Sequence, residues 1–273
     1  NGRSSYLVSA ELTFNDVNRI GGKWRNLLQL GRIGGLRSEF HQPFGEGGAF
    51  YLQPMLQFRG ESLPIWSGAV VQQAEYRLRR REFALEAGYS PVPHWRLGLA
   101  VFGGKDQVRR VIGDPQDFPS GSERYAGLRA RATWDSLDSI DFPGRGVRAN
   151  AELLAFQPWS GAALDGQVAR ISVDWARSWD RYHLLLGTRL ASAFDDQASF
   201  QAQSFLGGFL NLSGYAERSV LAPQAALARA VLYRRTGDTS ALFALPLYLG
   251  ASLEAGNAWA RRSQFGQGQP IFG

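Results

Sequence analysis

The sequence predicts an all-β chain that forms a transmembrane antiparallel β-barrel. Three observations support this fold class. Apolar and polar residues alternate with a period of two through most of the chain, the alternating segments are long, and one side of many segments carries charges in mid-strand. A period of two is that of a strand with two unlike faces. Roughly thirteen such segments of about nine to eleven residues match what a bilayer requires of β structure.

The composition of the 273-residue chain agrees with this fold class and excludes several others. Hydrophobic residues make up 44% of the chain, which also holds 32 glycines and eight tryptophans, so a disordered chain is not expected. The mean hydropathy is -0.23, and no run of about 18 apolar residues occurs. A helical membrane protein is therefore excluded, and no segment shows a convincing helical pattern.

The apolar sets of the strands often end in aromatic residues, such as Tyr89, Trp95, Trp134 and Trp175. Aromatic residues at both ends of an apolar band are typical of membrane barrels, where they lie at the two membrane surfaces. The clearest alternating segments are residues 6–14, 82–89, 95–102, 125–134, 147–153, 169–176 and 245–256.

A soluble β-sandwich could show the same alternation, because its apolar face is the core and its polar face is wet. The lengths of the connections favour the membrane barrel. Residues 79–82 and 180–182 are expected to be tight turns, and residues 105–123 and 157–166 are expected to be long loops. Short turns on one side and long loops on the other are the outer-membrane pattern. A soluble all-β binding protein stays a less favoured alternative.

Residues 134–153, WDSLDSIDFPGRGVRANAEL, have the chemistry of a tight turn. Aspartates can accept hydrogen bonds from nearby backbone N–H groups, proline fixes φ, and glycine permits positive φ. The stretch resembles the D-x-x-D…F-P-x-x-G hairpin turn of the BamA-like superfamily of outer-membrane assembly and secretion barrels, also called bacterial surface antigens. The resemblance implies a periplasmic turn shaped by Asp135, Asp138, Pro143, Gly144 and Gly146.

Residues 205–223, FLGGFLNLSGYAERSVLAP, are too apolar for a solvated loop and too rich in glycine for a strand. Within them, Leu212-Ser213-Gly214-Tyr215 is similar to the V-R-G-F/Y signature of the same superfamily, which lies in an extracellular loop folded into the barrel lumen. We therefore expect Gly208 and Gly214 to supply tight conformations, and Leu212 and Tyr215 to pack inside the barrel. Ser213 stands where the superfamily has arginine.

A third motif, residues 253–259 (LEAGNAW), resembles the superfamily strand in which an acidic residue faces the lumen and pairs with the loop arginine. The resemblance assigns that role to Glu254. Because Ser213 replaces the arginine, we hypothesise that Arg218 is the partner of Glu254. Besides Glu254, the residues expected to line the lumen and to contact the loop are Arg129, Arg131, Glu152 and Arg170.

The three motifs occur in the order found in the superfamily, and the resemblance covers nearly the whole chain. It implies a sixteen-stranded barrel, of which about thirteen strands are present in this chain. We therefore expect residues 1–273 to be one outer-membrane barrel domain that is incomplete at its C-terminal end. No signal-peptide pattern occurs in residues 1–12, so the chain is expected to belong to a longer protein.

Residues 18–44 are most similar to the barrels of patatin-like autotransporters of Gram-negative bacteria. This resemblance implies that the barrel anchors or translocates its own N-terminal passenger in type V protein secretion. The alternative is a general outer-membrane assembly barrel or a two-partner-secretion transporter. The expected partners are the outer-membrane bilayer and a passenger or client polypeptide. A homodimer is a further possibility that the sequence does not decide.

Catalysis, cofactors and metal binding are not expected of this chain. It has no Cys, its three histidines are far apart, and it has no P-loop or dinucleotide pattern. The G-x-S-x-G elbow is also absent, so a patatin-like hydrolase, if there is one, would lie upstream. The net charge of +6 comes from basic residues spread through the strands, so no nucleic acid is expected as a partner.

Overall fold

The computed structural model describes residues 6–31, 33–67, 71–114, 116, 120–162, 165–194, 200–236 and 247–273. The chain divides into two compact units. The first unit holds residues 1–132 and 153–167, and the second holds residues 133–152 and 168–273. Among the described residues there is no helix of the length and apolar character needed to cross a membrane.

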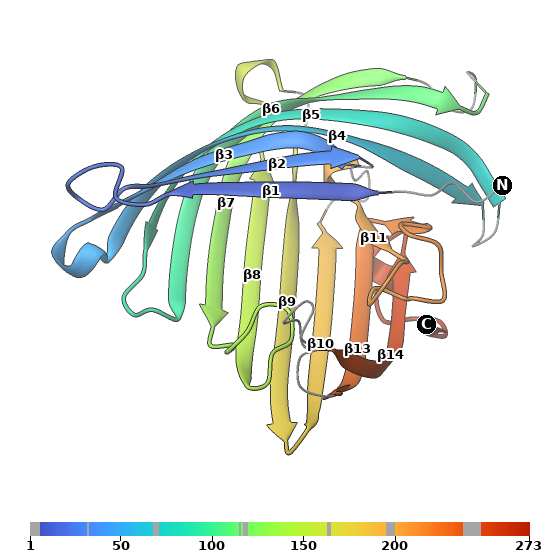
Figure 1. The fold of residues 1–273 in the computed structure, drawn as a ribbon. Helices are drawn as coiled ribbons and strands as arrows, with labels where there is room; N and C mark the ends of the chain where they lie inside the picture. Colours follow the sequence, from blue (N-terminus) through green and yellow to red (C-terminus); the bar gives the residue numbers. More distant parts are fainter. Residues whose placement is uncertain are drawn as a thin grey trace. The chain divides into compact units, whose positions relative to one another are not determined.

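Nearly all regular structure in the described residues is β-strand, with short 3-10 turns between strands (Figure 1). Thirteen strands form one sheet in the order β1-β2-β3-β4-β5-β6-β7-β8-β9-β10-β13-β14-β15, while β11 pairs with β12 alone. The all-β prediction is therefore confirmed. The strands are β1 (Leu7–Phe14), β2 (Lys23–Gly31), β3 (Ile33–Phe44), β4 (Phe50–Ser67), β5 (Val71–Tyr89), β6 (Trp95–Ile112), β7 (Gly121–Asp135), β8 (Gly146–Phe156), β9 (Gly166–Trp179), β10 (Tyr182–Ala193), β11 (Ser204–Leu206), β12 (Val220–Ala222), β13 (Gln224–Arg235), β14 (Tyr248–Trp259) and β15 (Ile271–Phe272).

In the first unit, β1 to β6 pair antiparallel, each with the next. In β4, β5 and β6 the alternation has an unusual sense, since the apolar row is exposed and the opposite row, which carries the charged side chains, is more buried. In β5, Phe83 is exposed, while Glu86 on the opposite row is buried. In β6, Leu99 is exposed and Asp106 is buried. The polar side of these strands is therefore the packed side.

Two predicted connections of the first unit are wrong. Residues 79–82 are not a turn, because β5 runs without interruption from Val71 to Tyr89. Residues 105–123 are not one long loop, because β6 continues to Ile112 and β7 begins at Gly121. The physical reason is that β5 and β6 extend beyond their apolar rows. Charged side chains occur on both faces of these extensions, so the sequence there has the polar composition of a loop.

In the second unit, β9, β10, β13 and β14 pair antiparallel in that order. The tight turn predicted at residues 180–182 is confirmed, since β9 ends at Trp179 and β10 begins at Tyr182. Asp180 has a φ of 54°, a left-handed conformation that aspartate tolerates in turns. The long connection predicted at residues 157–166, which belongs to the first unit, also separates β8 from β9, and its residues 163–164 lie outside the described residues.

Candidate functional site

A row of charged residues crosses the second unit on one face. The row runs across four neighbouring strands, and each member lies directly opposite the next. Its members are Asp174 of β9, Gly187 of β10, Arg229 of β13 and Glu254 of β14. Directly opposed residues in an antiparallel sheet point to the same face. Arg229 spans the glycine, and its Nη2 donates a hydrogen bond of 2.7 Å to Oδ1 of Asp174. The ion pair therefore joins β13 to β9 across an intervening strand.

The missing side chain at Gly187 makes this ion pair possible. A Cβ atom built there would lie 2.6 Å from Nε of Arg229 and 2.6 Å from Oδ1 of Asp174. Real Cβ atoms do not approach other heavy atoms so closely. Gly187 therefore leaves the space through which the guanidinium of Arg229 reaches its carboxylate.

We expect Gly187→Ala to destabilise the protein by about 1–3 kcal/mol, the usual cost of overpacking. A glycine-to-alanine change in a strand interior otherwise stabilises slightly. Gly34→Ala in β3 is the matched control, because no atom lies within 4 Å of the added Cβ. Urea unfolding in detergent measures both variants. Equal stability of the two would contradict the role assigned to Gly187.

The chain between β10 and β13 returns to the charged row. β11 packs against β13, and β12 packs against β14, as Figure 1 shows for β11. We call residues 207–219, which join β11 to β12, the docked loop. Its internal backbone hydrogen bonds include Gly208 N–H to the Tyr215 carbonyl and Tyr215 N–H to the Leu212 carbonyl. These bonds give the loop a defined shape although it is not extended strand.

Leu212 anchors the docked loop in an apolar cluster. Its side chain is 0% exposed and packs with three other buried residues, Leu206, Ala225 and Leu227. The cluster joins the loop to the wall of β13. Partly buried side chains complete the cluster around its edge, and these are Tyr215, Val220, Ala258 and Ile271.

Glu254 binds the docked loop directly. Its Oε2 accepts hydrogen bonds from the backbone N–H groups of Leu212 at 2.6 Å and Ser213 at 2.8 Å. Its Oε1 accepts from the hydroxyls of Ser213 and Ser252, both at 2.8 Å. The Glu254 residue is 0% exposed. Ser213 thus binds Glu254 through its backbone and its hydroxyl, in place of an arginine.

The hypothesis that Arg218 is the partner of Glu254 is corrected. The guanidinium of Arg218 instead lies 5.0 Å from the ring centre of Phe205. Arg229 contacts the loop, since its Nη1 donates to the Leu210 carbonyl at 3.3 Å. Sequence reasoning missed Arg229, although a lone charge within the apolar run of residues 225–232 was a usable signal.

Of the two glycines predicted to supply tight conformations, only Gly208 does so. Gly207 and Gly208 have φ of 105° and 103°, so Gly208 fulfils its expected role. Gly214 does not have positive φ, and a Cβ there would meet only ordinary contacts at 3.5 Å or more. Leu212 instead adopts a φ of 73°. A buried leucine tolerates this strained conformation only because its side chain and its N–H are both held.

The turn motif forms its expected hydrogen bonds in a longer connection. Asp138 accepts from the N–H groups of Gly144 at 2.8 Å and Arg145 at 3.1 Å. Asp135 accepts from the Leu137 N–H at 3.1 Å. However, residues 136–145 separate β7 from β8, so the connection is not tight.

Only one of the two turn glycines needs its special conformation. Gly146 has a φ of 115°, and a Cβ there would overlap the Ser136 carbonyl. Gly144 lacks positive φ, which corrects the prediction for that residue. Pro143 acts through its carbonyl, which accepts a hydrogen bond from the hydroxyl of Tyr233 on β13. The connection is thereby attached to the wall of the second unit.

The four predicted lumen-lining residues are all in ion pairs on the polar side of their strands. Arg129 pairs with Glu82 at 3.0 Å, and Arg131 lies 3.6 Å from Glu86, all in the first unit. In the second unit, Arg170 pairs with Glu152 at 3.1 Å. Arg170 also donates to the Gln201 carbonyl at 3.1 Å, shortly before the docked loop.

The two faces of these strands define the class of fold. In β14, Leu249 and Leu253 are 72% and 66% exposed, whereas Glu254 is fully buried. Exposed apolar rows of this kind, with charges on the opposite face, are what a transmembrane β-barrel presents to lipid and to its lumen. A soluble sandwich would have buried the leucine row.

No protein-family model and no curated protein matches this sequence. Solved structures do match. BamA from Haemophilus ducreyi lacking POTRA domains 1-3 has a TM-score of 0.73 at 13% identity, over 93% of this chain and 55% of that one. CdiB from Escherichia coli has a TM-score of 0.63 at 13% identity, over 92% and 48%. CdiB from Acinetobacter baumannii has a TM-score of 0.63 at 9% identity, over 98% and 49%.

The fold is therefore that of the BamA and CdiB outer-membrane β-barrels. This likeness agrees with the barrel fold that the sequence predicted. The chain spans about half the length of the solved structures it matches.

Proposed function

We propose that this chain is the barrel of an outer-membrane protein that anchors a polypeptide and moves it across, or inserts it into, the membrane. The observation that carries the proposal is the docked loop bound to Glu254 and Arg229 on the polar face of β13 and β14. A charged, hydrated face lets a polar chain pass without exposing its backbone to lipid. A loop held there by hydrogen bonds can close that path and be released from it.

The passenger is proposed to be part of the same protein, as in the patatin-like autotransporters that residues 18–44 resemble. The alternative is a barrel that assembles or secretes separate client proteins, which the likeness to BamA and CdiB also allows. The sequence upstream of the chain distinguishes them. One transport-associated domain after a hydrolase supports the first, and a series of such domains without an enzyme supports the second.

The membrane position is tested by two single-cysteine variants in β9, since the chain has no Cys of its own. Ile171 is 48% exposed on the apolar row, and Ser172 lies next to it on the polar row, where its hydroxyl accepts from Asn150. In outer-membrane preparations we expect a charged maleimide to label Ser172→Cys at least about tenfold faster than Ile171→Cys, because lipid excludes the reagent.

The two competing folds give opposite orders of labelling, so each variant serves as the control for the other. In a soluble β protein the exposed Ile171→Cys thiol would react faster than the half-buried Ser172→Cys thiol. Unfolding the protein in urea should remove the difference between the labelling rates of Ile171→Cys and Ser172→Cys. Faster labelling of Ile171→Cys in intact membranes would refute the membrane position.

A further inference from the structure

A band of basic residues continues the exposed apolar row of β5. From Tyr89 backwards, every second residue of this strand points to the exposed face, and Phe83 is the last apolar one before the charges begin. The next three on the same face are Arg81, Arg79 and Arg77, all exposed. An apolar band followed on the same face by cations is the arrangement of a membrane surface, where acyl chains give way to headgroups.

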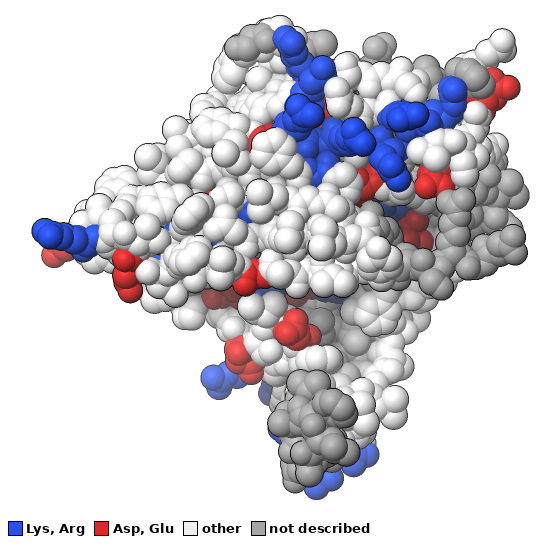
Figure 2. Space-filling view, turned by 45° about the horizontal axis from the view of Figure 1, so that its top comes forward, with Lys and Arg blue, Asp and Glu red and all other residues white. Residues whose placement is uncertain are grey.

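The neighbouring strands extend this band. In β6, Lys105 lies directly opposite Arg81, and Arg109 lies directly opposite Arg77. In β7, Arg124 precedes the exposed apolar row that includes Leu128. Figure 2 shows Lys and Arg side chains gathered in one group on the face in view. We call the six cations the basic band, and they are Arg77, Arg79, Arg81, Lys105, Arg109 and Arg124.

The basic band has no acidic partner in the described part of the chain. None of its six side chains forms an ion pair or a side-chain hydrogen bond there. On the opposite face of the same strands, Arg80 pairs with Asp106 at 2.7 Å and Arg129 with Glu82 at 3.0 Å. Like charges opposed across strands destabilise a sheet. An anion from outside the chain would therefore stabilise this group of like charges.

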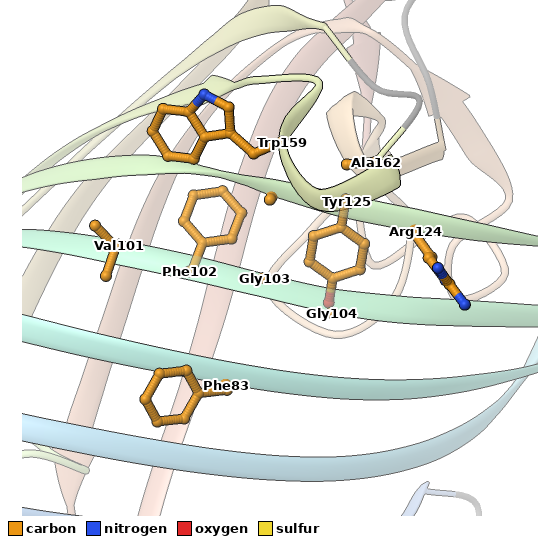
Figure 3. A pocket seen from close by; sticks show the side chains of 10 residues that line it. Phe83, Val101, Phe102, Gly103, Gly104, Arg124, Tyr125, Trp159 and Ala162 are labelled. Atoms are coloured by element: carbon orange, nitrogen blue, oxygen red, sulfur yellow. The ribbon is translucent and has the colours of Figure 1, made fainter.

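A hollow lies where the apolar row meets the basic band (Figure 3). It has a volume of about 360 Å³. Its lining includes Phe83, Val101 and Arg124, with Trp159 from the connection after β8. Gly103 is also part of the lining, and a side chain would fit there, since its Cβ would meet only ordinary contacts at 3.5 Å or more. The hollow therefore combines aromatic and aliphatic walls with a cation at its edge.

We propose that the basic band and this hollow bind the headgroup of a membrane lipid that carries more than one phosphate. The proposal rests on the membrane position proposed above. Arginine side chains match phosphate oxygens with two parallel hydrogen bonds. The apolar row beside the band contacts the acyl chains, and the hollow receives the part of the lipid nearest the headgroup.

The extent of the band is the reason for more than one phosphate. Arg77 and Arg81 are about 13 Å apart along the strand, and β5 to β7 span roughly 10 Å across it. A single phosphate is too small to reach cations at both ends of such an area. A headgroup with two separated phosphates can satisfy the charges on several strands at once.

The test uses the whole protein reconstituted in phosphatidylcholine vesicles. The vesicles also contain diphosphoryl lipid A, monophosphoryl lipid A or phosphatidylglycerol, at equal total negative charge. After extraction in mild detergent, native mass spectrometry counts the retained lipids. We expect the wild type to retain diphosphoryl lipid A in preference to the other two, and Arg77→Gln/Arg79→Gln/Arg81→Gln to bind it about a hundredfold more weakly.

Two further variants separate the causes. Arg19→Gln/Arg145→Gln/Arg181→Gln removes the same charge from exposed connections, and should bind like the wild type. Gly103→Leu keeps every charge but fills the hollow, and should weaken retention of lipid A several-fold. Heat-modifiable migration on gels checks that each variant still forms the folded barrel.

Equal retention by the wild type and the band variant would overturn the proposal, and so would equal retention of all three anionic lipids. A band-dependent acidic protein that co-purifies without lipid would also overturn it. If any of these contrary results is found together with the labelling pattern expected for Ile171→Cys and Ser172→Cys, only the proposed lipid site is refuted. If the labelling pattern fails as well, both proposals fall.

Discussion

We expect Glu254→Gln to release the docked loop from the wall of the second unit. The carboxylate accepts four hydrogen bonds, from two backbone N–H groups and two hydroxyls. A glutamine amide can turn its oxygen to the two backbone N–H groups and its NH2 to the two hydroxyls, but every charge-assisted hydrogen bond then becomes a neutral one. A hydrogen bond to a charged group contributes about 1.5–3 kcal/mol and a neutral one about 0.5–1.5 kcal/mol, so over the four bonds the loop loses roughly 2–5 kcal/mol of docking free energy.

Trypsin reports this release directly. Arg218 is the sole lysine or arginine in residues 205–223, so cleavage after it measures the opening of the loop. When opening and closing are fast, the cleavage rate follows the population of the open form. We expect Glu254→Gln to raise the rate by at least about tenfold in the folded protein. An unchanged rate would contradict the binding role of Glu254.

Two second-site variants provide the controls. Ser213→Ala removes a hydroxyl that binds Glu254, so its effect should couple to that of Glu254→Gln in a double-mutant cycle. Arg218→Lys keeps the trypsin site and lies elsewhere in the loop, over Phe205. Its effect should add to that of Glu254→Gln. If Glu254→Gln coupled to Arg218→Lys and added to Ser213→Ala, Arg218 rather than Ser213 would be the partner of Glu254.

The second large effect is expected at Leu212. This side chain is fully buried between β11 and β13, and removing a buried leucine side chain to alanine costs about 2–5 kcal/mol. Phe209→Ala in the same loop is the matched control, because Phe209 is 87% exposed. We expect trypsin cleavage after Arg218 to rise strongly in Leu212→Ala and to stay near the wild-type rate in Phe209→Ala.

Leu212→Gly separates packing from backbone conformation. The φ of 73° at this position is costly for leucine and free of strain for glycine. If conformation dominated, the glycine variant would hold the loop more firmly than the wild type. We expect the loop to open more readily instead, because the lost apolar burial outweighs the relief of backbone strain. A more protected loop in Leu212→Gly would contradict the packing role.

The alternation of apolar and polar residues along each strand determined much of the fold. Phe83 and Glu86, or Leu253 and Glu254, lie on opposite faces because successive side chains of a strand point in opposite directions. That relation is local, so it can be read from a short window of sequence. It does not show where a strand ends, and the charges at residues 79–82 therefore resembled a turn although β5 runs through them.

The sequence by itself also singled out residues 212–215 and Glu254, since their motifs are short and contiguous. Only the tertiary structure decided how they meet. The space that Gly187 leaves for Arg229, and the choice of Ser213 over Arg218 as the group that binds Glu254, depend on which residues face each other across strands. Hydrogen bonds between residues about forty positions apart, such as Leu212 and Glu254, depend on strand register and loop conformation, which no local pattern encodes.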